Sequence, residues 1–304
     1  MQTPTDSNTP HADNSDWAAL QISGADRLPF LQGQLTQDVE RLRPAEALLA
    51  GWASPKGRLL CVAWLIDWQD SVWMILPNEL ADQVMKRLQM FVLRSAVTIS
   101  KPADVSVNPV GSELLPTADI PDISLDKSDI NYCFSNKLSA IISPKNISDM
   151  ALLISATPTN SNASGNAACW QQRCIAAGIP QVYASTHEEF VPQMLNLDLL
   201  DAISFTKGCY VGQEIVARTQ NLGRIKRRMY AFSANSQLQL QPGQAVYSGS
   251  ETVGQIVDSV ADGDRTTMLA VIRIPDLNNK LSVAEEGDNF LQRLTLPYEV
   301  PESI

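Results

Sequence analysis

The sequence predicts an α+β protein whose chain ends in a small antiparallel β-barrel. Up to about residue 228, strand-like apolar runs alternate with segments in which apolar residues recur at helical spacing. This order of strand, helix, hairpin, helix and strand is typical of an α+β lobe. After residue 228, short strand-like runs follow one another between turn formers such as Pro242-Gly243. Several short strands at this spacing favour a barrel.

The first elements of the lobe are a strand and a helix. The apolar run from Trp17 predicts a strand, and the turn residues 23–24 lead into a helix. Apolar residues recur in that helix at helical spacing: Leu28, Leu31 and Leu35.

A hairpin and a second helix follow. The runs "RLLCVAWLIDW" and "SVWMILP" are separated by Gln69-Asp70, which predicts two strands joined by a tight turn. The next segment predicts an amphipathic helix with Asn78 as its N-cap. Its apolar face is expected to carry Leu80, Val84, Leu88 and Phe91, and "VTIS" is expected to end the lobe as a strand.

The middle of the chain is poorer in regular patterns. Residues 101–150 are loop-rich with short apolar runs such as "LSAIIS" and "MALLIS", and 157–168 is expected to be a flexible loop or linker because Ser, Asn, Thr and Ala dominate it. The segment "AACWQQRCIAAGIP" predicts a helix that ends at Gly178. Residues 1–15 are expected to form a disordered tail.

Composition excludes several classes of protein. A net charge of -10 argues against a protein that coats nucleic acid by bulk charge. No apolar run approaches the length of a transmembrane helix, and the N-terminus lacks the features of a signal peptide, so we expect a cytoplasmic protein without membrane contact. Five scattered cysteines without a CxxC pair, and two histidines, predict no metal site.

The stretch "SFTKGCYVGQEIVARTQNLGRIKRR" holds the strongest chemical signal. Cys209 could be an ordinary buried thiol. However, Lys207 lies two residues before it and a helix is expected to start near Gly212, and both features stabilise a thiolate. Cys209 is therefore a candidate reactive thiol, with Lys207 as its support. A cysteine hydrolase is weakly supported, because nothing in the sequence brings His187 to Cys209 as a general base.

Two further features leave alternatives open. The segment 218–228 carries five cations without an intervening acid, which is either a solvated segment at a domain junction or a site for phosphate or polycarboxylate. Trp17 and Trp170 each open a structured segment after a polar stretch. They are either core residues or a surface for stacking a flat heterocycle.

The segment "KGCYVGQEIVAR" resembles the signature of the YgfZ-type folate-binding proteins, which are tRNA-modification and iron–sulfur-associated relatives of the glycine cleavage T-protein. The segments "ISGADRLPFLQGQLTQDV", "SPKGRLL" and "FVPQMLNLDLLDAISFTKGCY" resemble other parts of the same family. The resemblance implies a T-protein-like α+β fold. Two interlocked lobes in residues 16–227 would form a folate channel, and residues 228–304 would form an antiparallel β-barrel.

The resemblance also implies site residues and a role. Trp17 and Trp170 would bind tetrahydrofolate or a derivative, with Cys209 at the channel. Additional candidates for folate contact lie in the signature: Tyr210, Gln213, Glu214 and Arg218. The implied role is that of an accessory protein that supports iron–sulfur enzymes, including those that thiolate tRNA.

The sequence departs from the aminomethyltransferases of this superfamily. Leu60 and Cys61 stand where those enzymes carry paired aspartates, which argues against aminomethyl transfer. Asp201 stands where glycine is common. Two alternatives remain: a folate-dependent one-carbon transferase using Asp38 or Glu214 as acid or base, and a protein that contacts tRNA directly through Arg218–Arg228.

Overall fold

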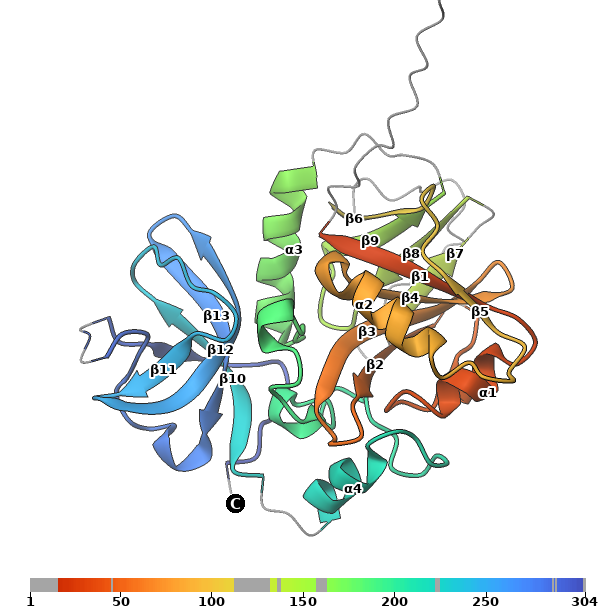
Figure 1. Ribbon diagram of the computed structural model, residues 1–304. Coiled ribbons are helices and arrows are strands. Elements are labelled where there is room, and N and C mark those ends of the chain that lie inside the picture. Colours follow the sequence, from red (N-terminus) through yellow and green to blue (C-terminus); the bar gives the residue numbers. More distant parts are fainter. Residues whose placement is uncertain are drawn as a thin grey trace, which may run out of the picture.

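The computed structural model describes residues 16–44, 46–111, 132–135, 138–156, 163–221, 225–285, 287 and 289–302. In these residues the chain forms three antiparallel sheets and four α-helices (Figure 1). The tail expected at 1–15, residues 157–162 of the expected loop, and Arg224 of the basic segment lie outside the described residues. Within the described part, no helix has the length and apolar character needed to cross a membrane.

The first sheet has five strands. Their order across the sheet is β2 (Ala47–Ala53), β3 (Leu59–Trp68), β4 (Ser71–Pro77), β1 (Trp17–Ser23) and β5 (Thr98–Ser100). The expected hairpin is confirmed, because β3 pairs with β4 in antiparallel register. Its two turn residues both have positive φ, 52° at Gln69 and 54° at Asp70, as a type I′ turn requires.

Three expectations for this lobe need correction. Helix α1 spans only Arg27–Gln32, so Leu35 lies beyond it and forms an isolated bridge with Trp52. Helix α2 spans Asn78–Gln89, and Pro77 occupies its N-cap position without a side-chain hydrogen bond, so Asn78 is the first helical residue and not the N-cap. Phe91 follows the end of α2 and is 36% exposed, because the amphipathic pattern runs past the last helical turn.

The second sheet occupies a region that looked loop-rich in the sequence. Its order is β6 (Ser106–Gly111), β9 (Met150–Ser155), β8 (Ser139–Ser143) and β7 (Tyr132–Ser135). The runs "LSAIIS" and "MALLIS" supply β8 and β9. These strands are five and six residues long, too short to show a clear periodicity without knowledge of their partners.

Helix α3 (Ala163–Ala177) stands between the first two sheets and the third (Figure 1). It ends as expected at Gly178, whose φ of 67° favours glycine. The amide of Ile179 donates to the carbonyl of Cys174 at 2.9 Å, and the amide of Gly178 donates to Ile175 at 3.1 Å. This Schellman-type end turns the chain sharply into the extended segment 179–183.

Short helical turns and α4 lead from there to the third sheet. The chain passes η4 (Ala184–Thr186), η5 (Pro192–Leu195) and α4 (Gln213–Asn221). Between η5 and α4, Asp201 adopts a φ of 50°, in the left-handed region. Its carbonyl accepts a hydrogen bond from the Gln37 amide, and its carboxylate pairs with Arg41 at 3.2 Å. Aspartate is one of the non-glycine residues that adopt this left-handed conformation most often.

The third sheet is a curled, six-stranded half-barrel. Its order is β14 (Leu281–Ser282), β11 (Ala245–Ser248), β12 (Glu251–Asp262), β13 (Arg265–Arg273), β10 (Arg227–Ala234) and β15 (Gln292–Leu294), with η6 (Ile274–Asp276) after β13. All six strands fall on the runs expected from the sequence. The sheet curls until its two edge strands approach each other: just before β15, the amide of Leu291 donates to the carbonyl of Leu281, and Phe290 forms an isolated bridge with Ser282 in β14.

One apolar core joins all three sheets. It includes Leu20 of β1, Ile154 of β9, Trp170 of α3 and Val271 of β13, each no more than 1% exposed. A second apolar cluster fills the inside of the half-barrel around Tyr230 and Phe232. The half-barrel therefore has a core of its own and also packs one side against the remainder of the chain.

Candidate functional site

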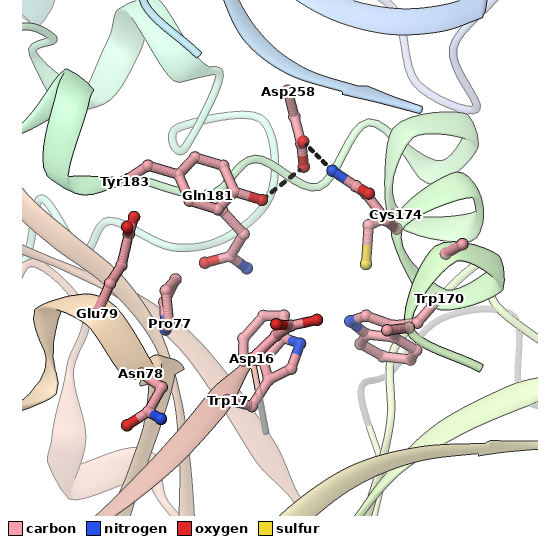
Figure 2. Close-up of a pocket in the computed structure, with 13 residues that line it drawn as sticks. Asp16, Trp17, Pro77, Asn78, Glu79, Trp170, Cys174, Gln181, Tyr183 and Asp258 are labelled. Atoms are coloured by element: carbon pink, nitrogen blue, oxygen red, sulfur yellow. Dashed lines mark hydrogen bonds between the residues drawn. The ribbon is translucent and has the colours of Figure 1, made fainter. Parts of the chain in front are cut away.

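A cavity of about 660 Å³ lies where the first sheet, α3 and the half-barrel meet (Figure 2). Such a volume is ordinary for a small-molecule site. The lining residues come from four parts of the chain: Asp16, Trp17, Pro77, Asn78, Glu79, Ala167, Ala168, Trp170, Gln171, Cys174, Gln181, Tyr183 and Asp258.

Both tryptophans singled out in the sequence line this cavity. Trp17 is the first residue of β1 and pairs with Pro77 at the end of β4, which places it at the edge of the sheet where α2 begins. Trp170 comes from α3. The two ring centroids are 6.3 Å apart and the planes are inclined by 84°. A flat ligand can therefore stack on one indole while meeting the edge of the other, but it cannot lie parallel to both.

The opposite wall carries a buried carboxylate. Asp258 follows a bulge in β12, where the pairing with β13 shifts register between Ile256 and Asp258. Its oxygens accept hydrogen bonds from Tyr183 Oη at 3.0 Å, from Gln171 Nε2 and from the amide of Ser259 at 2.8 Å. Figure 2 shows this network above the tryptophans. Because Asp258 is 1% exposed, burial raises its pKa to about 6 despite the three donors.

The surroundings of Asp258 favour the neutral forms of two neighbouring groups, the Tyr183 phenol and the Cys174 thiol. Burial, followed by the charge of Asp258, raises the pKa of the Tyr183 phenol and of the Cys174 thiol well above their ordinary values. A tyrosine that stays protonated keeps donating to the carboxylate. The wall is therefore a fixed network in which the phenol is the donor and Asp258 the acceptor.

The stability of this wall depends on pH with a defined sign. The unfolded chain ionises Asp258 near pH 4, whereas the folded chain does so near pH 6, so the folded state binds more protons between these values. The free energy of unfolding should therefore fall as pH rises from about 4 to 6, by about 2 kcal/mol from this group. In Asp258→Asn that part of the decline should vanish, as measured by urea denaturation at a series of pH values.

The exposed Asp264→Asn serves as the control for this pH series, since it changes the same side chain on the β12–β13 turn. Its profile should follow that of the unmodified chain. An Asp258→Asn profile with the same slope as the unmodified chain would contradict the assignment.

Two polar groups in the cavity have no partner among the described residues. Gln181 is 2% exposed, and neither its Oε1 nor its Nε2 is hydrogen-bonded. The indole nitrogen of Trp170 is also buried without an acceptor. Buried polar groups normally find partners. These three atoms are therefore the groups most ready to bind a ligand.

The signature cysteine does not line this cavity. Cys209 is exposed, in the segment before α4. Lys207, expected to support its thiolate, donates to the backbone carbonyls of Leu35 at 2.9 Å and Gln37 at 2.7 Å. Burial lowers the pKa of Lys207 to about 8, against the opposing effect of the nearby acids Asp38 and Glu40. The ammonium thus ties the signature to the segment after α1.

The remaining signature candidates are also outside the cavity. Tyr210 is buried, and the centroid of its ring lies 5.2 Å from Lys207 Nζ. Burial raises the pKa of its phenol to about 12. Gln213 and Glu214 begin α4, and Arg218 is exposed in its last turn. The expected helix start near Gly212 is confirmed, because α4 begins at Gln213.

The residues considered for acid, base or metal chemistry are scattered. Asp38 caps η1 (Val39–Arg41) and accepts from Gln32. His187 lies 3.1 Å from the carbonyl of Leu60 and 3.3 Å from Gln83, so its hydrogen bonds in the described residues lead to these two residues and not to Cys209. Cys61 is fully buried in β3, and burial raises its pKa to about 12. Across the described residues, no group of His, Cys, Asp and Glu could hold a metal ion.

The cations of the segment 218–228 that the structure describes fall into two environments. Arg228 is 4% exposed and forms a two-pronged ion pair with Asp198 at 2.6 and 2.8 Å. It also donates to the carbonyl of Gln193 at 3.0 Å. Arg228 is therefore an internal cation, while Arg218, Lys226 and Arg227 are exposed.

Sequence reasoning missed the polar residues of the cavity. Gln181 and Tyr183 directly follow the "AGIP" segment that ends α3, which could have drawn attention to them. Nothing in the sequence marks Asp258 as a site residue, because it stands in a strand of ordinary composition in the half-barrel. Only the tertiary structure brings it to the tryptophans.

Comparison with solved structures identifies the fold. The chain resembles the glycine cleavage system aminomethyltransferase T from Bartonella henselae with a TM-score of 0.67 at 11% sequence identity. The match covers 93% of this chain and 84% of that one. The fold is therefore T-protein-like.

Curated relatives narrow the class. The chain is 29% identical over 303 residues to the tRNA-modifying protein YgfZ of Colwellia psychrerythraea, covering 93% of this chain and 91% of that protein. It is 27% identical over 308 residues to the tRNA-modifying protein YgfZ of Yersinia enterocolitica, covering 94% and 92%. No protein-family profile matches the chain. The resemblance to the YgfZ-type proteins that the signature predicted is confirmed.

Proposed function

We propose that this protein binds a tetrahydrofolate derivative in the cavity at Trp17 and Trp170 and acts in tRNA modification by supporting iron–sulfur enzymes. The observation that carries the proposal is the meeting of the two tryptophans at the edge of a cavity of about 660 Å³. The pterin and aminobenzoyl rings of folate are flat, and an indole face offers them a stacking surface worth about 0.5–1.5 kcal/mol beyond burial.

The relatives supply the biological setting of the proposal. The curated relatives named tRNA-modifying proteins match more than nine-tenths of the chain. The five cysteines, all free, fit the reducing cytoplasm, where tRNA and most iron–sulfur enzymes occur. On this proposal the lobes of residues 16–227 and the half-barrel enclose the folate together, since both contribute side chains to the cavity.

Folate binding is tested by changing each tryptophan of the cavity. Trp17→Ala and Trp170→Ala should each weaken tetrahydrofolate binding at least about tenfold, because each removes a stacking surface from the ligand. The measurement is isothermal titration calorimetry on the full chain, at a temperature where circular dichroism shows both variants folded. Unchanged affinity in both variants would reject the folate site.

A matched control separates binding from core damage. Trp68 is also buried, 3% exposed, and it packs against Trp73 with ring centroids 5.0 Å apart, but it does not line the cavity. Trp68→Ala should therefore lower thermal stability while leaving the dissociation constant of tetrahydrofolate unchanged.

Cys209 is the proposed reactive thiol of the same function. Because it is exposed and does not line the cavity, Cys209→Ala should bind tetrahydrofolate like the unmodified chain. The loss of the thiol should instead be seen in cells. A deletion strain that carries the gene for Cys209→Ala should show less tRNA thiolation than one that carries the unmodified gene. Full restoration by Cys209→Ala would remove the thiol from the proposal and leave the folate site standing.

A further inference from the structure

We infer that Gln181 selects the ligand of the cavity by forming two hydrogen bonds to a cyclic amide, an N–H next to a C=O, on the edge of a flat ring. This inference rests on the proposed function and assigns the ring as the pterin of the folate. Gln181 lies in the extended segment after α3, and Figure 2 shows its amide group directed into the cavity on the side of Trp17.

The other polar side chains of the wall are already engaged. Asp258 accepts three hydrogen bonds, from Tyr183 Oη, from one N–H of Gln171 and from the amide of Ser259. Glu79 accepts from the amide of Ala184 at 2.8 Å, at the rim where α2 begins. Among the described residues that line the cavity, the amide of Gln181 and the indole N–H of Trp170 are the buried polar groups without a partner, so a ligand in the cavity can satisfy them.

Burial makes the free amide of Gln181 costly. Its side chain is 2% exposed, and both polar atoms lack a partner. An unpaired buried amide destabilises the folded chain, and an apolar residue of similar size would avoid this cost. A polar group kept under these conditions is expected where a ligand satisfies it.

The amide pattern specifies the complementary ligand edge. Oε1 accepts one hydrogen bond and Nε2 donates, so their complement is a donor adjacent to an acceptor. In a tetrahydropterin these are the ring N3–H and the C4 carbonyl. The indole N–H of Trp170 requires a separate acceptor, and its buried nitrogen faces the same space. The aminobenzoyl-glutamate half of folate has no such cyclic amide.

The test compares two probes on four forms of the full chain by isothermal titration calorimetry: the unmodified chain, Gln181→Met, Gln181→Glu and Gln172→Met. The probes are tetrahydrofolate and p-aminobenzoylglutamate, which lacks the pterin. Gln181→Met keeps the length of the side chain and removes both hydrogen bonds. It should weaken tetrahydrofolate binding about 10–100-fold and leave the affinity for p-aminobenzoylglutamate unchanged. Gln172→Met, on α3 but outside the cavity, should change neither.

Thermal denaturation without ligand supplies a second readout. Gln181→Met should melt at the same temperature as the unmodified chain or up to about 4 °C higher, because an unpaired buried amide is removed. A purely structural glutamine would instead lower the melting temperature when changed.

Each outcome of the test has a defined meaning. If the unmodified chain binds tetrahydrofolate and Gln181→Met binds it equally well, the role of Gln181 is overturned while the folate proposal stands. If Gln181→Glu, whose carboxylate only accepts, binds more tightly, the ring presents two donors and the cyclic-amide assignment is overturned. If the unmodified chain binds neither probe, the proposed function falls and this inference falls with it.

Discussion

Replacing Gly212 by alanine should lower the melting temperature by about 5–10 °C, although the change adds one methyl group. Gly212 has a φ of 82°, and a Cβ there would stand 2.4 Å from the carbonyl oxygen of Ser54 and 3.3 Å from the Cα of Gly57. Both contacts are with backbone, which cannot move aside as a flexible side chain can. The strained φ and the clash together should cost about 2–4 kcal/mol.

Gly208 provides the matched control within the same signature. A Cβ at Gly208 would meet no atom within 4 Å, and its φ is not in the left-handed region. Gly208→Ala should therefore melt within about 2 °C of the unmodified chain. Equal melting temperatures for the two alanine variants would show that the close approach of α4 to the turn at 54–57 does not exist in solution.

Asp198→Ala should cost about 3–5 kcal/mol of stability, because it leaves the guanidinium of Arg228 buried without its counter-ion. The pair joins the first strand of the half-barrel to the segment after η5. In the same place, Asn196 Nδ2 donates to the carbonyl of Met229 at 2.7 Å. The loss should appear as a lower free energy of unfolding in urea.

A double variant and an exposed pair test the cause. Asp198→Leu combined with Arg228→Met removes both charges, so it should recover most of the stability that Asp198→Ala loses. Arg41→Ala breaks an ion pair of the same type whose side chains are 52% and 70% exposed, and should cost less than about 1 kcal/mol. If Asp198→Ala and Arg41→Ala cost the same, the pair at Arg228 is open to solvent.

The elements found from the sequence were those with a local signal. The β3–β4 hairpin has two strand-like runs around a two-residue turn, and α3 has a glycine at its end. In contrast, β2 was missed. Its sequence "ALLAGWA" is buried on both faces and therefore shows no alternation, and its alanines and glycine are poor strand formers.

The candidate site was predictable only in part, for a physical reason. The sequence singled out Trp17 and Trp170 by their positions in motifs, but it could not show that the rings meet, because this depends on how α3 packs beside β1. Gln181 could be recognised only in the folded chain, where its side-chain amide is buried without a partner among the described residues. Asp258 reaches the cavity through a bulge in β12 that no local rule predicts.

The walls of the cavity come from different sheets, so a bound ligand would help to hold the half-barrel against the rest of the chain. Trp17 belongs to the first sheet and Asp258 to the half-barrel, so a molecule that contacts both walls holds the two parts of the chain together. By mass action, a ligand at 100 times its dissociation constant stabilises the folded chain by about 2.7 kcal/mol. A bound ligand should therefore raise the stability of the whole chain, because the first sheet, α3 and the half-barrel all contribute side chains to its cavity.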